Sequence, residues 1–336
     1  ASSVSALGRV DLTAAVAAAV TFILGMLASF PDKITLAVSL SIITTWVLAT
    51  RKVTHRYVEA LSEADLLDTL KMGIIALVIY PILPAEPPDP WGVINLRQIW
   101  LFVILVSLIG YTGYILIRIL GAERGLTLTG ILGGLASSIA VTSSLAQESK
   151  INPQILSSAV FATAIASSTV FPRVLFIAAV VNMELLADLI IPLLTMTAVG
   201  AALAYISHRK SPPQGGEVKV SDPFRILPAL KLGSLFALVL IISRLSGLYF
   251  GDTGIYAASI LSGLLDVDAI TLSMATLARS TLVPSVAATS ITLAVIANTL
   301  VKLAMAYLLG SREFGNRTAA ILLPIALAGI LSLLLI

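Results

Sequence analysis

The sequence predicts an all-α polytopic membrane protein with about nine to eleven membrane helices, an internal repeat that we expect to be inverted, and broken or re-entrant segments. Three observations indicate this class. The 336-residue chain is 58% hydrophobic and only 12% charged, whereas soluble domains are about half apolar and a quarter charged. Eleven apolar runs are long enough to cross about 30 Å of hydrocarbon, and none alternates as a strand would. One of these runs also resembles another run 129 residues further along the chain.

The apolar runs follow one another through short loops, and each is expected to be a membrane helix or a broken one. The mean hydropathy of the whole chain is +1.01, as expected when most residues lie in hydrocarbon. The runs are residues 12–30, 34–50, 66–83, 98–120, 126–147, 154–181, 185–207, 227–249, 254–278, 283–309 and 318–336.

The charges and the missing residue types exclude several classes of function. The net charge is +3, but the lysines and arginines are scattered over short loops and form no stripe, so we expect no nucleic-acid partner. There is no cysteine, and the only histidines, His55 and His208, lie in basic loops. Zinc and haem sites are therefore not expected, and neither a His-Glu-x-x-His motif nor a serine-histidine dyad within the membrane is present. We expect no enzyme and no cofactor.

The resemblance between two runs indicates a duplicated unit. Without a gap, "GILGGLASSIAVTSSLA" (130–146) aligns with "SILSGLLDVDAITLSMA" (259–275) and shares eight of seventeen residues. The match resumes at a shift of 131, where Pro153 falls on Pro284 and "ASSTV" (166–170) on "ANTLV" (297–301). The expected divisions are 1–60, a membrane helix with an external loop at 61–97, a first unit at 98–207, a cytoplasmic basic linker at 208–227 and a second unit at 228–336.

Loop charges bear on which runs cross the membrane. If the second run of each unit enters and leaves on one face, the basic loops 51–56, 121–125, 208–225 and 310–317 all become cytoplasmic, as the positive-inside rule favours. That arrangement has nine full spans, two re-entrant segments and two units of opposite orientation, a recurrent plan in transporters. A parallel duplication in which every run crosses stays open.

Two aspartates in "GLLDVDAITLS" (263–273) are the most informative polar residues. An ionised aspartate at the centre of a membrane helix costs about 2.5 to 3.5 kcal/mol, so it usually faces a cavity or a partner. Residues two apart on a regular helix point about 200° apart. If Gly263 eases a break in the helix, however, Asp266 and Asp268 can both contact one cation. Carboxylate oxygens suit Mg²⁺ or another hard cation, so both aspartates are candidate metal ligands.

Further polar residues are candidates to complete an ion site. Asn298 and Lys302 share one helix face, and we expect Lys302 to neutralise Asp266 or Asp268. Arg173, after Pro172, is expected to extend to the nearer membrane interface. Serine and threonine hydroxyls in these runs either face the site or bond back to their own helix. The candidate ion-binding residues are Ser137, Ser138, Thr142, Ser144, Ser167, Ser168, Asp266, Asp268, Thr271, Ser273, Asn298 and Lys302.

Several segments, in this order and spacing, resemble an integral-membrane domain of unknown function, family 4010. They are "LKMGIIALVIYPILP" (70–84), "DPWGVINLRQIW" (89–100), "GLTLTGILGGLASSIAVTSSLA" (125–146), "FPRVLFIAAVVN" (171–182), "GLLDVDAITLSMA" (263–275) and "ANTLVKLAMAYLLG" (297–310). The resemblance covers about 60–336. In that family the domain commonly follows an MgtC/SapB-type membrane domain, which is associated with magnesium stress. Residues 1–60 resemble the tail of such a domain.

These observations together predict a transporter or channel for a small cation in the plasma membrane of a prokaryote. A divalent ion such as Mg²⁺ and coupling to protons both stay open. One alternative is an anion or small organic-acid carrier that uses Lys302 and Arg173, and another is a regulatory membrane protein that transports nothing. The expected partners are the lipid bilayer and a small inorganic ion, and a homodimer is left open.

Overall fold

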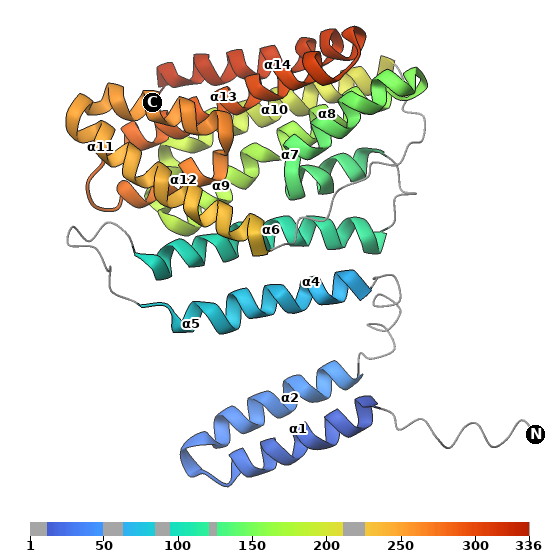
Figure 1. The fold of residues 1–336 in the computed structure, drawn as a ribbon, viewed down its shortest axis with the longest axis vertical. Helices are drawn as coiled ribbons and strands as arrows, with labels where there is room; N and C mark the ends of the chain where they lie inside the picture. Colours follow the sequence, from blue (N-terminus) through green and yellow to red (C-terminus); the bar gives the residue numbers. More distant parts are fainter. Residues whose placement is uncertain (1–11, 50–62, 85–94, 121–125, 211–225, 336) are drawn as a thin grey trace, which may run out of the picture. The chain divides into compact units, whose positions relative to one another are not determined.

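The structure is a computed structural model, and it describes residues 12–49, 63–84, 95–120, 126–210 and 226–335. These ranges are helical apart from turns and short connections, and they contain no strand (Figure 1). The all-α prediction is therefore confirmed. The chain divides into two compact units, residues 1–62 and 63–336. The basic loops 51–56 and 121–125, and most of the predicted linker 208–227, lie outside the described residues.

The first unit is a pair of apolar helices. Helix α1 (Leu12–Ala28) and helix α2 (Ile34–Ala49) pack against each other across the 3-10 turn η1 (Pro31–Lys33). Pro31 occupies the first turn position, where its missing N–H leaves no hydrogen bond unmade. Phe22 and Ile42 remain more than 60% exposed, so each helix presents an apolar face outward.

The second unit contains the other helices. It begins with α4 (Glu63–Gly73), a π-helical segment η2 (Ile74–Ile79) and α5 (Tyr80–Ile82), and continues with α6 (Leu96–Leu120), α7 (Leu126–Ile151), η4 (Pro153–Ile155), α8 (Leu156–Ser168), α9 (Val170–Val181), η5 (Met183–Leu185) and α10 (Leu186–Lys210). After the linker come α11 (Ile226–Leu265), α12 (Val267–Leu277), α13 (Pro284–Leu309), α14 (Arg312–Ser332) and η6 (Leu333–Leu335). Gly251 interrupts α11 with a positive φ of 61°, a conformation that glycine adopts without strain.

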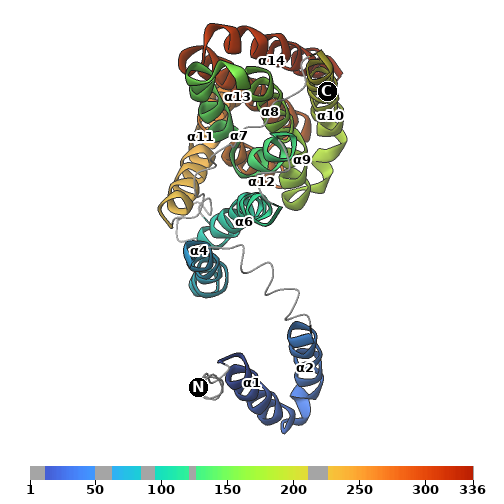
Figure 2. The ribbon, with the colours of Figure 1, turned by 90° about the vertical axis from the view of Figure 1, so that its right-hand side faces the viewer.

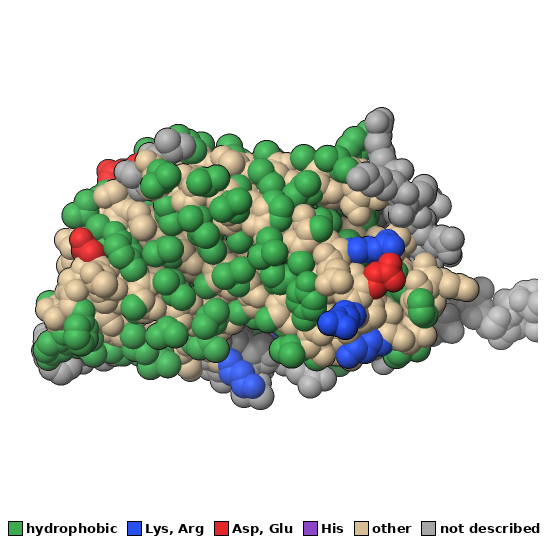
Figure 3. Space-filling view, turned by 90° about the horizontal axis from the view of Figure 1, so that it is seen from above, with side chains coloured by type: hydrophobic (Ala, Val, Ile, Leu, Met, Phe, Trp, Pro, Cys, Tyr) green, Lys and Arg blue, Asp and Glu red, His purple; other side chains and the backbone are tan. Residues whose placement is uncertain are grey.

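The second unit has the exterior of a membrane protein. Six helices among the described residues are long and apolar enough to cross a bilayer, namely Leu96–Leu116, Pro153–Val181, Met183–Ser207, Gly233–Leu265, Pro284–Leu309 and Arg312–Ser332. Leu323, Leu327 and Leu331, which follow one another along one face of α14, are each at least 50% exposed. Figure 3 shows a face with a broad apolar band and most of the visible charged side chains toward its ends. Such a continuous apolar surface indicates contact with lipid.

The interior of the second unit centres on α8, α9, α12 and α13. Nearly every residue of α8 and of α12 is buried, and α7, α10 and α14 all pack on α8 (Figure 2). Helix α12 packs between α9, α11 and α13. A helix that is apolar on all sides belongs in the interior of a bundle. The polar residues carried by these helices therefore lie inside the protein, away from lipid.

Helix α7 begins and ends near the same end of α8, the end at which α8 starts. A Cβ on Gly130 would contact Ala162 at 3.1 Å, and one on Gly134 would meet the Cα of Ala166 at 2.7 Å. The first half of α7 therefore runs beside α8 and in the same direction. The second half ends at Ile151, and the turn that begins at Pro153 leads directly into the start of α8. Both ends of α7 consequently lie near the start of α8, and its middle lies deeper in the bundle.

Candidate functional site

Two helices of the second unit are interrupted at residues that also cap the following segment. Ser137 in α7 has φ −166° and ψ 103°, and its Oγ accepts a hydrogen bond from the Ala140 N–H at 3.2 Å. Asp266, between α11 and α12, has φ −157° and ψ 125°, and its Oδ1 accepts bonds from the N–H groups of Asp268 and Ala269 at 2.8 and 2.9 Å. Each break thus starts a new helix with a capped N-terminus. The interruption considered for "GLLDVD" is present, at Asp266.

Glycine lies three residues before each break, at a close helix contact. A Cβ on Gly134 would lie 2.7 Å from the Cα of Ala166, and one on Gly263 would lie 2.6 Å from the Cα of Ala294. No side chain fits at such separations, so glycine is required by the close approach of the backbones. The segment before each break is thereby held tightly against α8 or α13.

Asp268 forms an ion pair with Arg173 of α9. Arg173 Nη2 donates to both carboxylate oxygens of Asp268, at 3.0 and 2.9 Å, and the two side chains are only 12% and 7% exposed. Arg173 Nη1 also donates to the Leu135 carbonyl at 3.0 Å, just before the break in α7. A planar guanidinium can make both contacts at once, whereas an ammonium is a point charge.

This pair corrects two predictions. Arg173 was expected at the membrane interface, but its guanidinium lies inside the bundle because Asp268 and the Leu135 carbonyl bind it there. Lys302 was expected to neutralise an aspartate, yet its side chain is fully buried and its Nζ has no hydrogen-bond partner in the described ranges. Arg173 instead donates to both oxygens of the Asp268 carboxylate.

Asn298 of α13 forms a hydrogen bond just before the break at Asp266. Its Nδ2 donates to the Gly263 carbonyl at 3.2 Å. The last turn of an interrupted helix leaves carbonyl groups without intrahelical partners. Asn298 therefore satisfies a carbonyl before the break at Asp266, as Arg173 does for Leu135 before the break at Ser137.

The two breaks meet at a cavity of about 190 Å³. That volume holds several water molecules or one partly hydrated ion. Arg173, Asp268 and Asn298 contribute polar groups, and Asp266 forms no ion pair with a described side chain. The cavity is lined by Val106, Ala136, Ser137, Ser138, Ile139, Arg173, Asp266, Val267, Asp268 and Asn298.

The remaining predicted hydroxyls do not line this cavity. Four of them donate to the carbonyl four residues earlier in their own helix, at 2.7 to 2.8 Å. These four are Thr142, Ser168, Thr271 and Ser273. Ser144 is partly buried elsewhere, and Ser167 is buried with no partner for its Oγ among the described groups. Back-bonding satisfies a membrane hydroxyl locally, so its presence in an apolar run is weak evidence for a site.

The arrangement suits a small hydrated ion better than a tightly held metal. The described residues contain no group of three or more histidine, cysteine, aspartate or glutamate side chains that could hold a metal. Two carboxylates, an amide and two hydroxyls surround the cavity instead. Mg²⁺ commonly keeps several waters and binds only one or two carboxylates. Bound water would have to complete the coordination of any divalent cation here.

The fold and the site define a helical, multi-pass membrane protein with a buried ion pair where two interrupted helices meet. The chain belongs to the family described as domain of unknown function DUF4010, whose model matches residues 104–310. A relative in Aquifex aeolicus (strain VF5), described as an uncharacterized protein, is 31% identical over 192 residues, which are 56% of this chain and 84% of the relative. No solved structure matches the chain.

Proposed function

We propose that this protein transports a small cation across the membrane, with the binding site in the cavity between the two interrupted helices. The observation that carries the proposal is the meeting of both breaks at a cavity lined by two carboxylates, the buried Asp268 and the partly buried Asp266. Broken helices near the middle of a membrane domain expose backbone carbonyl groups and helix N-termini to a substrate. Aspartates inside the membrane usually mark an ion pathway, because their burial is costly unless function requires it.

Arg173 has the role of an internal counter-ion in this proposal. A buried carboxylate is strongly destabilised when it is left unpaired. A cation that reaches Asp268 takes over the charge compensation that Arg173 otherwise provides. Arg173 can then keep its bond to the Leu135 carbonyl while it releases Asp268. Binding of the cation thus becomes coupled to the contact between α9 and α12.

We also propose that α7 and the segment 254–278, which comprises the part of α11 after Gly251 together with α12, are re-entrant and belong to inverted repeats. Ser137 and Asp266, like Gly134 and Gly263, are separated by the same 129 residues and occupy equivalent places at the two breaks. Helix α7 begins and ends beside one end of α8, and α12 packs back on α11. Ser311 N–H donates to Ser149 Oγ at 3.2 Å, so the end of α7 lies beside the start of α14. Helix α14 begins at Arg312, within the residues 310–317 that were predicted to be a basic loop. The equivalent breaks and the position of the end of α7 support an arrangement with nine full spans.

The alternative is a carrier of a small anion or organic acid. It is favoured by the capped helix N-terminus after each break, because partial positive charge gathers there. It is also favoured by the Lys302 side chain, whose Nζ has no hydrogen-bond partner among the described groups. Arg173 is already neutralised by Asp268, however, whereas Asp266 has no cationic partner among the described side chains. The lining therefore carries an excess of negative charge, and we favour the cation. In the regulatory alternative, the ion pair of Arg173 and Asp268 would only stabilise the packing of the helices.

We further propose that residues 1–60 are the tail of an MgtC/SapB-type domain and that the protein lies in the plasma membrane of a prokaryote. The apolar pair α1 and α2 and the relative in Aquifex aeolicus support this placement. Magnesium is accordingly the first ion to test.

The decisive experiment is ion flux into proteoliposomes that contain the full chain. The parent should transport Mg²⁺, another divalent ion or a monovalent cation, and Asp266→Asn and Asp268→Asn should each reduce the rate at least tenfold. The amide keeps the shape but loses the charge that offsets cation dehydration. Asp252→Asn is the matched control, because Asp252 is exposed on α11. Parent-like flux of every tested cation in both Asp266→Asn and Asp268→Asn would refute the site, and flux of anions alone would favour the carrier.

A further inference from the structure

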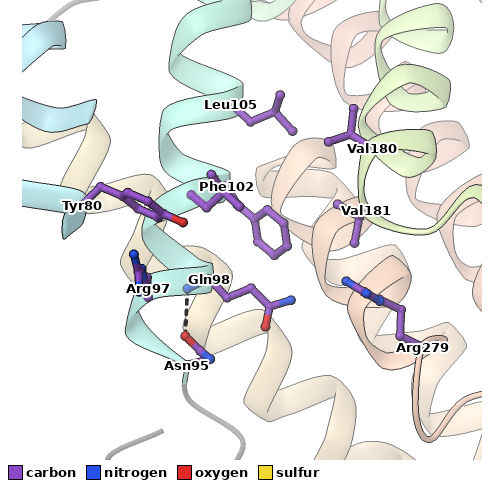
Figure 4. A pocket seen from close by; sticks show the side chains of 10 residues that line it. Tyr80, Asn95, Arg97, Gln98, Phe102, Leu105, Val180, Val181 and Arg279 are labelled. Carbon is purple, nitrogen blue, oxygen red and sulfur yellow. Dashed lines mark hydrogen bonds between the residues drawn. The ribbon is translucent and has the colours of Figure 1, made fainter. Parts of the chain in front are cut away.

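A second cavity lies away from the two helix breaks, where the ends of several helices come together. Its volume is about 380 Å³. Tyr80 comes from α5, Arg97 and Gln98 from the first turn of α6, Val181 from the end of α9, and Arg279 from the residues just after α12 (Figure 4). None of its lining residues belongs to the central cavity. Leu96 is the first residue and Val181 the last residue of two segments long enough to cross the membrane. This cavity therefore lies near an edge of the membrane domain.

The polar part of this cavity is cationic. Its lining contains two arginines and no carboxylate. Figure 4 shows Arg97 and Arg279 on opposite sides, with Gln98 and Phe102 between them. Neither arginine forms an ion pair with a described side chain. Two guanidinium groups facing one space, without an acidic partner in the described residues, favour an anion between them.

Arg97 is held in place without its hydrogen-bonding capacity being used up. Its Cζ lies 5.0 Å from the centre of the Tyr80 ring, a cation–π contact. Its Nε is buried and has no hydrogen-bond partner among the described groups. A buried donor without a partner is costly. An anion in the cavity would give Arg97, which lines it, a charged hydrogen-bond partner that the described residues do not supply.

Apart from Tyr80 and Asn95, the rest of the cavity wall is apolar and continues onto the lipid-facing surface. Phe102 is buried against the wall, while Leu101 and Val180 are 45% and 55% exposed. An acyl or alkyl chain lying here would extend into the surrounding hydrocarbon. The cavity thus has a cationic end and an apolar end, which matches the two parts of an amphiphilic anion.

We propose that this cavity binds a phosphate or carboxylate group that carries an apolar chain. The anionic group lies between Arg97 and Arg279 and accepts a bond from the Gln98 amide, and the chain lies along Leu101, Phe102 and Val180. Arginine is suited to phosphate and carboxylate because its fork of N–H groups matches their oxygens. Basic pockets between membrane helices bind lipid head groups for this reason. The source is either an anionic phospholipid of the bilayer or a free amphiphilic anion.

The test is thermal unfolding of the full chain in an uncharged detergent with three probes. These are short-chain phosphatidylglycerol, short-chain phosphatidylcholine and hexyl phosphate. We expect phosphatidylglycerol to raise the unfolding midpoint more than phosphatidylcholine, since binding to the folded state stabilises it. A larger shift with phosphatidylglycerol than with hexyl phosphate assigns the site to a membrane lipid, and the reverse assigns it to a free anion. Equal shifts with the two phospholipids would overturn the proposal.

Variants make the test specific to the cavity. Arg279→Gln and Arg97→Gln should each raise the half-saturating phosphatidylglycerol concentration about tenfold or more, because each removes a charged hydrogen bond. Arg279 is exposed, so its replacement leaves folding intact. Arg97→Lys, which keeps the charge, should lose less affinity than Arg97→Gln. Arg312→Gln, an exposed arginine at the start of α14, is the matched control. Parent-like affinity in both glutamine variants would contradict the site.

Discussion

Arg173 Nη2 lies 3.0 and 2.9 Å from the two carboxylate oxygens of Asp268, although the residues are 95 positions apart in the chain. Because Arg173 Nη1 also donates to the Leu135 carbonyl, one guanidinium joins α9, α12 and the segment before the break in α7. Any motion that separates these elements must break a charged hydrogen bond. The pair is therefore placed to couple events in the central cavity to movement of the interrupted helices.

The first prediction concerns the energetic coupling of this pair. Arg173→Met or Asp268→Asn alone leaves a buried polar or charged group without its partner, and each should destabilise the protein by about 3 to 5 kcal/mol. The double variant should lose less than the sum of the single changes, because neither unpaired charge remains. Chemical denaturation of all four proteins in the same detergent measures the coupling. Additive losses would show that the pair contributes no coupling energy.

The second prediction concerns Lys302. Its Nζ is buried without a hydrogen-bond partner in the described ranges, so Lys302→Met removes an unsatisfied group and keeps most of the side-chain volume. The free energy of unfolding should change by less than about 1 kcal/mol or increase. Arg173→Met, measured beside it, should cost clearly more. If Lys302→Met lowered the free energy of unfolding as much as Arg173→Met does, Lys302 would have to be the partner of an aspartate after all.

The third prediction concerns the glycines before the breaks. Gly134→Ala and Gly263→Ala should each cost about 1 to 3 kcal/mol, because the new methyl group collides with the backbone of Ala166 or Ala294. Gly73→Ala is the matched control, since a Cβ there meets nothing within 4 Å. It should be neutral or stabilising by about 0.5 to 1 kcal/mol, because alanine favours a helix. Similar effects at all three positions would argue against the close packing.

The fourth prediction concerns topology. The chain has no cysteine, so a single introduced cysteine reports its own side of the membrane. In the proposed inverted arrangement, Ser280→Cys should react with an impermeant reagent from outside, whereas Glu123→Cys and Gly215→Cys should react only after permeabilisation. If every run crossed, Glu123 and Gly215 would lie on opposite sides, and Ser280 would share the side of Gly215. Labelling in that second pattern would show that the two units have the same orientation in the membrane and are not inverted.

Much of the candidate site follows from local sequence, and part of it does not. The break near Asp266 was considered from the sequence because Gly263 precedes two aspartates, and the cap at Asp266 is a local interaction. The break at Ser137 was not predicted, and the close contacts of Gly134 and Gly263 are made with Ala166 and Ala294 of other helices. The hydroxyls of Thr142 and Thr271 were predicted near the ion, but they bond to their own helices. Sequence spacing places such groups on a helix face without showing which bond they form.

The sequence by itself determined that the chain is helical and lies in a membrane, and it located the two aspartates whose place in an apolar run requires an explanation. These properties depend on composition, periodicity and short-range spacing, which every segment carries independently of its neighbours. Only the tertiary structure decided that Arg173, and not Lys302, binds Asp268. Lys302 lies nearer to Asp268 in sequence, but pairing depends on helix packing and on which side chain can meet both the carboxylate and the Leu135 carbonyl. Such long-range geometry leaves no local pattern in the sequence.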